Sequence, residues 1–210
     1  MKFNKTKHFI IITTLAIILI ILDQVSKLTA IKYLKGRNPK TVIPRIIEFD
    51  FLEGGNKGAA FGMLNNKILF FVVITILAIL VIIFIIRNLL LTVEYGINNN
   101  YQQIISQKNQ CILLCYTLTA LLSGAVGNFI DRITRRSVVD FISFKFINFP
   151  TYNVADIYVT LSCISIVIIC LCKFDNDIFN LVFTFKKPNF NELKSKEENK
   201  YVRRFHNRSK

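Results

Sequence analysis

Histidine is almost absent from this 210-residue chain: only His8 and His206 occur, both near the ends of the sequence. Nucleophilic catalysis by a Ser–His or Cys–His pair in the apolar part of the chain is therefore unsupported. The five cysteines, at positions 111, 115, 163, 170 and 172, form no Cys/His set with metal-ligand spacing. We therefore expect no metal and no cofactor, and we interpret the cysteines as small packing residues.

Acidic residues are also few, with 13 against 27 lysines and arginines and a formal net charge of +14. Such an excess can indicate nucleic-acid binding. Ten of the basic residues, however, follow Cys172 in a tail of low hydrophobicity, which has no nucleic-acid-binding motif. A basic tail beside a membrane most often lies along anionic headgroups. We therefore expect membrane lipids, and no nucleic acid, as partners, with residues 174–210 disordered or bound at the membrane surface.

Uncharged apolar runs are abundant: 52% of the residues are hydrophobic, and these residues gather in four blocks, 9–22, 68–86, 111–130 and 157–172. A bilayer core of roughly 30 Å needs about 20 helical residues. The middle two blocks are long enough alone. The first must continue through Asp23 and Lys27 to about Ile31, and the fourth must include Asn153 and Asp156. We predict an all-α membrane bundle of four transmembrane helices, in which the short spans have polar residues at one end.

The first block also resembles a secretory signal peptide, because Lys2, Lys5 and Lys7 precede its apolar core. No cleavage site with small residues follows it, and the segment from Asp23 to Lys27 continues the helix. We expect an uncleaved anchor.

The three loops that connect the predicted spans differ in composition. Loop one, 32–67, is rich in Gly and Pro and has short alternating runs, which predict strands and turns. Loop two, 88–110, is polar and is expected to be a simple connector. Loop three, 131–152, contains residues 137–147, a run long enough for a short interfacial helix or strand. Lysines and arginines near the spans number eight on the side of the termini and eleven across loops one and three, so charge bias gives no orientation.

Counting spans brings polar residues from four segments to one membrane face. Asp23 and Lys27 lie four positions apart on a helix, either as a local ion pair or as support for a site. Asn128 shares a helix face with Asp131 and Arg132. Ser123 and Gly127 would allow another helix to approach closely. Packing and a charge cluster explain the glycine, but not Asn128, which needs several hydrogen-bond partners.

Asp140 and Asp156 are the candidate catalytic residues. A lone aspartate at either position is more often a helix cap or a surface residue. Both, however, lie beside apolar sequence at one membrane face, where two carboxylates can share a proton and flank a water, as in aspartic proteases. Asn56 in loop one could donate to a peptide backbone, or it could simply precede a turn formed by Gly58 and Gly62.

Two other functions also fit these residues. In a non-enzymatic scaffold or small transporter, the same aspartates would serve as ion-pathway groups. In a Ser–Lys peptidase, the pair would be Ser143 with Lys145 or Ser26 with Lys27, and this requires a lysine held neutral in an apolar site.

Taken together, five segments resemble the lipoprotein signal peptidase (signal peptidase II) family of bacterial membrane aspartyl proteases. In order, they are Asp23-Gln-Val-Ser-Lys27, Asn56-Lys-Gly-Ala-Ala-Phe61, Gly124-Ala-Val-Gly-Asn-Phe-Ile-Asp-Arg132, Val138-Val-Asp-Phe141 and Tyr152-Asn-Val-Ala-Asp156. The order and spacing fit over roughly residues 9–173. Tyr152 replaces the usual Phe, and the tail extends past the end of most relatives.

The resemblance implies a peptidase domain over 1–173 with cytoplasmic termini in the bacterial inner membrane, an active site near the outer face, and a small extracytoplasmic β-cradle in the first loop. It implies prolipoprotein substrates with a diacylglyceryl-modified cysteine, which are cut just before that cysteine. We expect a monomer. The resemblance assigns catalysis to Asp140 and Asp156, and substrate binding or support to Asp23, Lys27, Asn56, Gly58, Asn128, Arg132 and Asn153.

Overall fold

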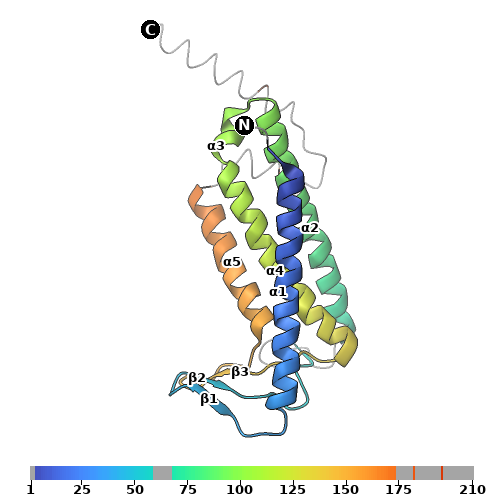
Figure 1. Ribbon diagram of the computed structural model, residues 1–210, viewed down its shortest axis with the longest axis vertical. Helices are drawn as coiled ribbons and strands as arrows, with labels where there is room; N and C mark the ends of the chain where they lie inside the picture. The colour runs from blue at the N-terminus through green and yellow to red at the C-terminus, as the bar shows by residue number, and fades with distance from the viewer. Residues whose placement is uncertain (1–2, 59–67, 174–181, 183–194, 196–210) are drawn as a thin grey trace.

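Four long helices form the framework of the computed structural model, which describes residues 3–58, 68–173, 182 and 195. They are α1 (Lys5–Tyr33), α2 (Ile68–Asn98), α4 (Lys108–Arg135) and α5 (Val154–Lys173), and the short α3 (Gln102–Ser106) joins α2 to α4 (Figure 1). All four are long and apolar enough to cross a membrane. The predicted four-span bundle is confirmed. The helix α1 extends through Asp23 and Lys27, whereas α5 includes Asp156 but begins one residue after Asn153.

The helix α4 lies at the centre of the bundle and packs against α1, α2 and α5. In its most apolar 18-residue window, 44% of the residues are buried, against 6–11% in the other three spans. The outward faces of α1, α2 and α5 carry many exposed large hydrophobic side chains. Such an inside-out distribution is typical of helices that face lipid.

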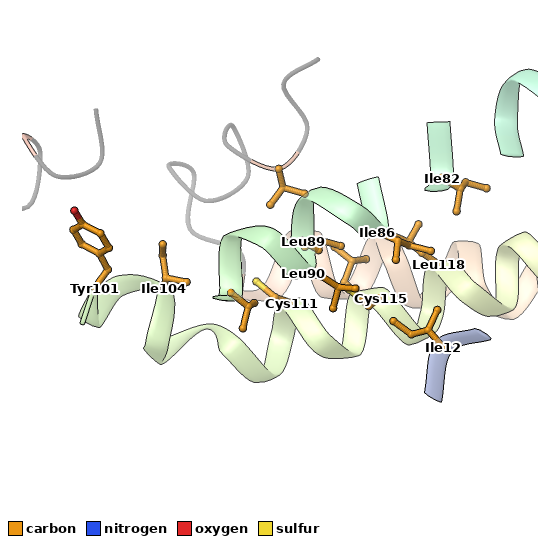
Figure 2. Close-up of a cluster of buried hydrophobic side chains, with 13 residues drawn as sticks. Ile12, Ile82, Ile86, Leu89, Leu90, Tyr101, Ile104, Cys111, Cys115 and Leu118 are labelled. Atoms are coloured by element: carbon orange, nitrogen blue, oxygen red, sulfur yellow. The ribbon is translucent and has the colours of Figure 1, made fainter. Parts of the chain in front are cut away.

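Residues 88–110 are not the connector that their polar composition suggested, and this prediction was wrong. The helix α2 continues to Asn98, and Leu89, Leu90 and Val93 are buried against α4. Apolar residues at this spacing lie on one helix face, so the segment buries a stripe despite its polar composition. Figure 2 shows Leu89 and Leu90 with Cys111, Cys115 and Leu118 in one core cluster, to which Val93 also belongs.

Val182 belongs to the same cluster, although it follows the predicted peptidase domain. Its side chain is fully buried, and the Asn88 Nδ2 donates to its carbonyl oxygen at 3.3 Å. The rest of the predicted tail, except Ser195, lies outside the described residues, as do residues 59–67 at the end of the predicted Gly-rich turn.

A three-stranded antiparallel sheet caps one end of the bundle, opposite α3 (Figure 1). Its strands, in order, are β1 (Lys40–Ile43), β2 (Ile47–Phe49) and β3 (Ile142–Phe144). The first loop therefore supplies two strands, and the third comes from loop three, where the sequence left helix and strand open. Isolated bridges pair Asn56 with Val138 and Ile142 with Tyr152. The Asn56–Val138 bridge and the pairing of β2 with β3 bring loop one beside the segment that carries Asp140.

Candidate active site

Asp140 lies in the loop between α4 and β3 and is almost completely buried. The backbone N–H of Leu52 donates to its carbonyl oxygen at 3.0 Å, which ties the Asp140 backbone to loop one. The side chain receives two amide donors: Asn153 Nδ2 lies 2.7 Å from Oδ1, and Asn56 Nδ2 lies 2.9 Å from Oδ2. The Gly58 N–H donates to Asn56 Oδ1 at 3.0 Å, so the Asn56 amide nitrogen faces Asp140.

Asp156 lies in the first turn of α5, and local helix chemistry holds it in place. Asn153 precedes the helix, and its Oδ1 accepts from the Asp156 N–H at 3.1 Å. In return, Asp156 Oδ2 accepts from the Asn153 N–H at 3.1 Å, which makes a reciprocal capping box. The other carboxylate oxygen, Oδ1, accepts from Asn128 Nδ2 of α4 at 2.8 Å. The Asp156 side chain is thus fixed by two helices.

The two carboxylates share one support, because Asn153 donates to both of them. Each of the four carboxylate oxygens receives one N–H donor. Burial, and to a lesser extent the negative charge of Asp156, raise the pKa of Asp140 to about 6. The hydrogen bonds from Asn56 and Asn153 and the positive charge of Lys27 act in the opposite direction. A pair of this kind holds one proton more easily than two negative charges.

An ion cluster with no solvent exposure lies beneath the pair. The Lys27 ammonium donates to Asp23 Oδ2 at 2.9 Å, Asp131 Oδ2 at 3.0 Å and Asn128 Oδ1 at 2.9 Å. Asp23 Oδ1 accepts from the Ala155 N–H at 3.0 Å, next to Asp156. Of the two interpretations of Asp23 and Lys27, the structure therefore favours support for the site over an ion pair confined to α1.

Small residues of α4 allow this close approach of helices. A side chain at Gly127 would collide with the Asp23 carboxylate, and a Cβ at Gly124 would lie 2.6 Å from the carbonyl oxygen of Ala155. Ser123 is fully buried. The predicted small-residue contact is confirmed at Gly127, and Gly124 adds a second contact, toward α5.

A cavity of about 600 Å³ lies between the sheet and the helices α4 and α5. Its polar lining includes Asn56, Asn128, Arg132, Asp140 and Asp156. Its apolar wall comes from the sheet, loop three and α5, and includes Ile47, Phe144, Phe149, Pro150, Tyr152, Ile157, Val159 and Leu161. The arrangement therefore places two carboxylates at one side of a mostly apolar chamber.

Among the described residues of this chamber wall, Arg132 is the cation. Its guanidinium lies 5.1 Å from the centre of the Phe71 ring, and its charge interacts with both Asp156 and Asp140. All nine candidate site residues therefore come together: six of them line the cavity, and Asp23, Lys27 and Asn153 support it from beneath.

Sequence reasoning assigned no role to Asp131 and did not identify the aromatic wall. The Asp131 side chain is fully buried, and its Oδ2 accepts from the backbone N–H of Val139 at 3.2 Å, next to Asp140. The signal was present, since Asp131 follows Asn128 by three residues on one helix face. No local pattern indicated that Phe144 and Phe149 would line a cavity.

The contacts do not support a Ser–Lys pair. Lys145 forms an exposed ion pair with Glu48 at 2.7 Å, and Ser26 donates to the backbone oxygen of Asp23. Lys27 donates to three acceptors, which leaves no lone pair to act as a base.

Four apolar spans with an aspartate pair buried at one end define, by class, an aspartic peptidase built into a membrane. Residues 15–172 match the family model described as Signal peptidase (SPase) II. The chain belongs to this family.

Relatives named lipoprotein signal peptidase cover most of the chain. The protein from Streptococcus agalactiae serotype Ia is 39% identical over 160 residues, which is 76% of this chain and 90% of the relative. The protein from Clostridium tetani is 39% identical over 152 residues, 71% of this chain and 85% of the relative. A bacterial membrane enzyme solved by the in meso method at 2.3 Å resolution superposes with a TM-score of 0.60 and 30% identity, over 76% of this chain and 87% of that chain.

Proposed function

We propose that this protein is an aspartyl endopeptidase that removes signal peptides from prolipoproteins, cutting just before a diacylglyceryl-modified cysteine. Membership of the signal peptidase II family and the names of the relatives support the reaction and its substrate class. The observation that carries the assignment to particular residues is the buried pair, Asp140 and Asp156, bridged by Asn153.

In the proposed mechanism, the two carboxylates share one proton and hold a water between them. The ionised member takes a proton from the water while the water oxygen attacks the scissile carbonyl carbon. The protonated member donates a hydrogen bond to the carbonyl oxygen. The proton taken from the water then passes to the leaving amine as the C–N bond breaks, which leaves the pair with its one shared proton. The pKa of Asp140, raised to about 6 by burial and by the charge of Asp156, supports retention of the shared proton. The surrounding amides orient the carboxylates, because each oxygen already has one N–H donor.

The remaining cavity residues would bind the substrate. The Arg132 guanidinium lies near the aspartates and can stabilise the negative charge that develops on the scissile carbonyl oxygen. The apolar wall beside α5 includes Leu161, which is largely exposed on the outer face of the bundle. Acyl chains of the modified cysteine could therefore lie along this face, with part of the binding energy coming from apolar contact.

We propose that both termini lie in the cytoplasm and that the site lies near the outer face of the bacterial inner membrane. The start of α1 and the end of α5 lie at the end of the bundle opposite the sheet, which fits this orientation (Figure 1). A monomeric state is part of the proposal. A peptidase domain over 1–173 and a membrane-surface tail over 174–210 remain part of the proposal, except at Val182, whose side chain is buried in the core of the bundle.

The test is cleavage of a lipidated prolipoprotein by the purified protein in detergent, with Asp140→Asn and Asp156→Asn beside wild type. Each variant should lose activity by on the order of 10²–10⁴-fold, the range for removing a general acid or base. Asp50→Asn is the matched control, because Asp50 lies at the same end of the molecule but does not line the cavity.

Full cleavage by either site variant would exclude the pair, and equal cleavage of the unlipidated precursor would exclude the substrate class. A transporter or scaffold would instead keep any cleavage in both asparagine variants and change ion or solute flux.

A further inference from the structure

The Lys27 ammonium is enclosed by three acceptors, one for each of its protons. Two are the carboxylates of Asp23 and Asp131, and the third is the side-chain oxygen of Asn128. The side chains of Lys27, Asp23 and Asp131 have no solvent exposure, so water does not compete for these bonds. An ammonium has donors only. The atom of Asn128 that faces Lys27 must therefore be the amide oxygen.

The opposite end of the same amide faces the proposed catalytic pair. With the oxygen turned to Lys27, the Asn128 Nδ2 is directed at Asp156 Oδ1, 2.8 Å away. Asn153 Nδ2 also donates to Asn128 Oδ1, at 3.1 Å. A reversed amide would place its NH₂ group against two donors and its oxygen against a carboxylate. The buried cation, with Asn153 as a second donor, thus fixes which end of Asn128 meets Asp156.

We propose that Lys27 is a positioning residue for the reaction: its ammonium sets the orientation of the Asn128 amide, and Asn128 in turn holds the carboxylate of Asp156. This inference rests on the proposed function. Asp23 and Asp131 hold the ammonium in place. Arg135, which pairs with the other oxygen of Asp131, balances the two carboxylates with a second cation. Lys27 does not touch the substrate cavity and acts only through its neighbour.

The test is a double-mutant cycle on kcat and KM for cleavage of the lipidated precursor, with Lys27→Met, Asn128→Ala and the double variant. Residues in one hydrogen-bond network typically couple by a few-fold to a hundredfold. We expect Lys27→Met to lower kcat about tenfold in the wild-type background, with KM little changed. In the Asn128→Ala background the same change should lower kcat less than about twofold, because no amide remains to be oriented. Lys32→Met, an exposed lysine on the same helix, is the matched control and should leave kcat unchanged.

A purely structural role for Lys27 would give the opposite pattern. The losses in kcat would then be equal in both backgrounds, and that result overturns the inference. If Lys27→Met fails to accumulate, the cycle is run with Asp131→Asn in every member. This change removes one carboxylate along with the cation and keeps an oxygen for the Val139 N–H. If the wild-type protein does not cleave the lipidated precursor, the proposed function is ruled out, and this inference is ruled out with it. Equal losses in a protein that does cleave remove the inference alone.

Discussion

Replacing Gly124 by alanine should separate catalysis from folding, because the new methyl group would press on the backbone that carries Asp156. The Cβ would lie 2.6 Å from the carbonyl oxygen of Ala155 and 2.8 Å from Val159 Cγ2. A carbonyl oxygen in a helix cannot rotate away as a side chain can. Restoring an ordinary contact of 3.4 Å requires a displacement of 0.8 Å between α4 and α5.

This displacement would move Asp156 of α5 relative to its amide donor, Asn128 of α4, and relative to Asp140, which lies on a separate loop. A misplacement of about 1 Å can cost about 10²-fold in rate. We expect kcat for the lipidated precursor to fall by about ten- to a hundredfold, while KM changes little. Within α4 itself, alanine favours the helix over glycine by about 1 kcal/mol, which limits the loss of stability.

The assay is steady-state cleavage together with thermal unfolding in the same detergent. Gly96→Ala is the matched control, since its Cβ would crowd the buried side chain of Ile104 near the end of α2 that is remote from the sheet, away from the helices that carry the aspartate pair and its donors. That variant should keep kcat within about twofold, even if its unfolding midpoint falls. A Gly124→Ala protein with unchanged kcat would refute the reasoning that helix spacing sets the geometry of the pair.

Two further outcomes follow from single contacts. Removing the Asn56 side chain with Asn56→Ala takes away a donor that lowers the pKa of Asp140, so that pKa should rise further above 6. The proton is then held to higher pH, and the limb of the pH–rate profile that Asp140 governs should move to higher pH. An unmoved profile would contradict this assignment. Val182→Ala should lower the free energy of unfolding by about 1.5 kcal/mol, because the Val182 side chain is fully buried in the α2–α4 core. Leu171→Ala, at an exposed position on α5, should have little effect on unfolding of the purified protein. If Val182→Ala lowered the free energy of unfolding no more than Leu171→Ala does, Val182 would lie outside the core.

Much of the site could be located from the sequence by counting the membrane spans. An even number of spans returns the chain to the same face, so the polar ends of spans one, three and four had to converge. The capping relation of Asn153 and Asp156 is also local, since the two residues are three positions apart in one helix turn. These features depend on helix geometry and on the cost of placing charge in lipid, and both act residue by residue.

The donors of the pair could not be predicted in the same way. Asn56 and Asp140 are 84 residues apart, and Lys27 and Asn128 are 101 residues apart. Which amide faces which oxygen depends on how closely the helices approach, and Gly124 and Gly127 decide that. Composition also misled for 88–110, where a buried helix face is formed by a few apolar side chains among polar ones.

The sequence by itself therefore determined the four spans and the face on which the charged residues meet, and its resemblance to signal peptidase II singled out Asp140 and Asp156 as the proposed catalytic pair. Only the tertiary structure decided that β3 comes from loop three, that Asp131 supports the segment before Asp140, and that a buried ammonium at Lys27 orients Asn128. The physical reason is the distance along the chain between the residues that interact. Hydropathy and helix periodicity are sums over neighbouring residues, whereas the hydrogen bonds of the site join segments that meet only after the bundle has closed.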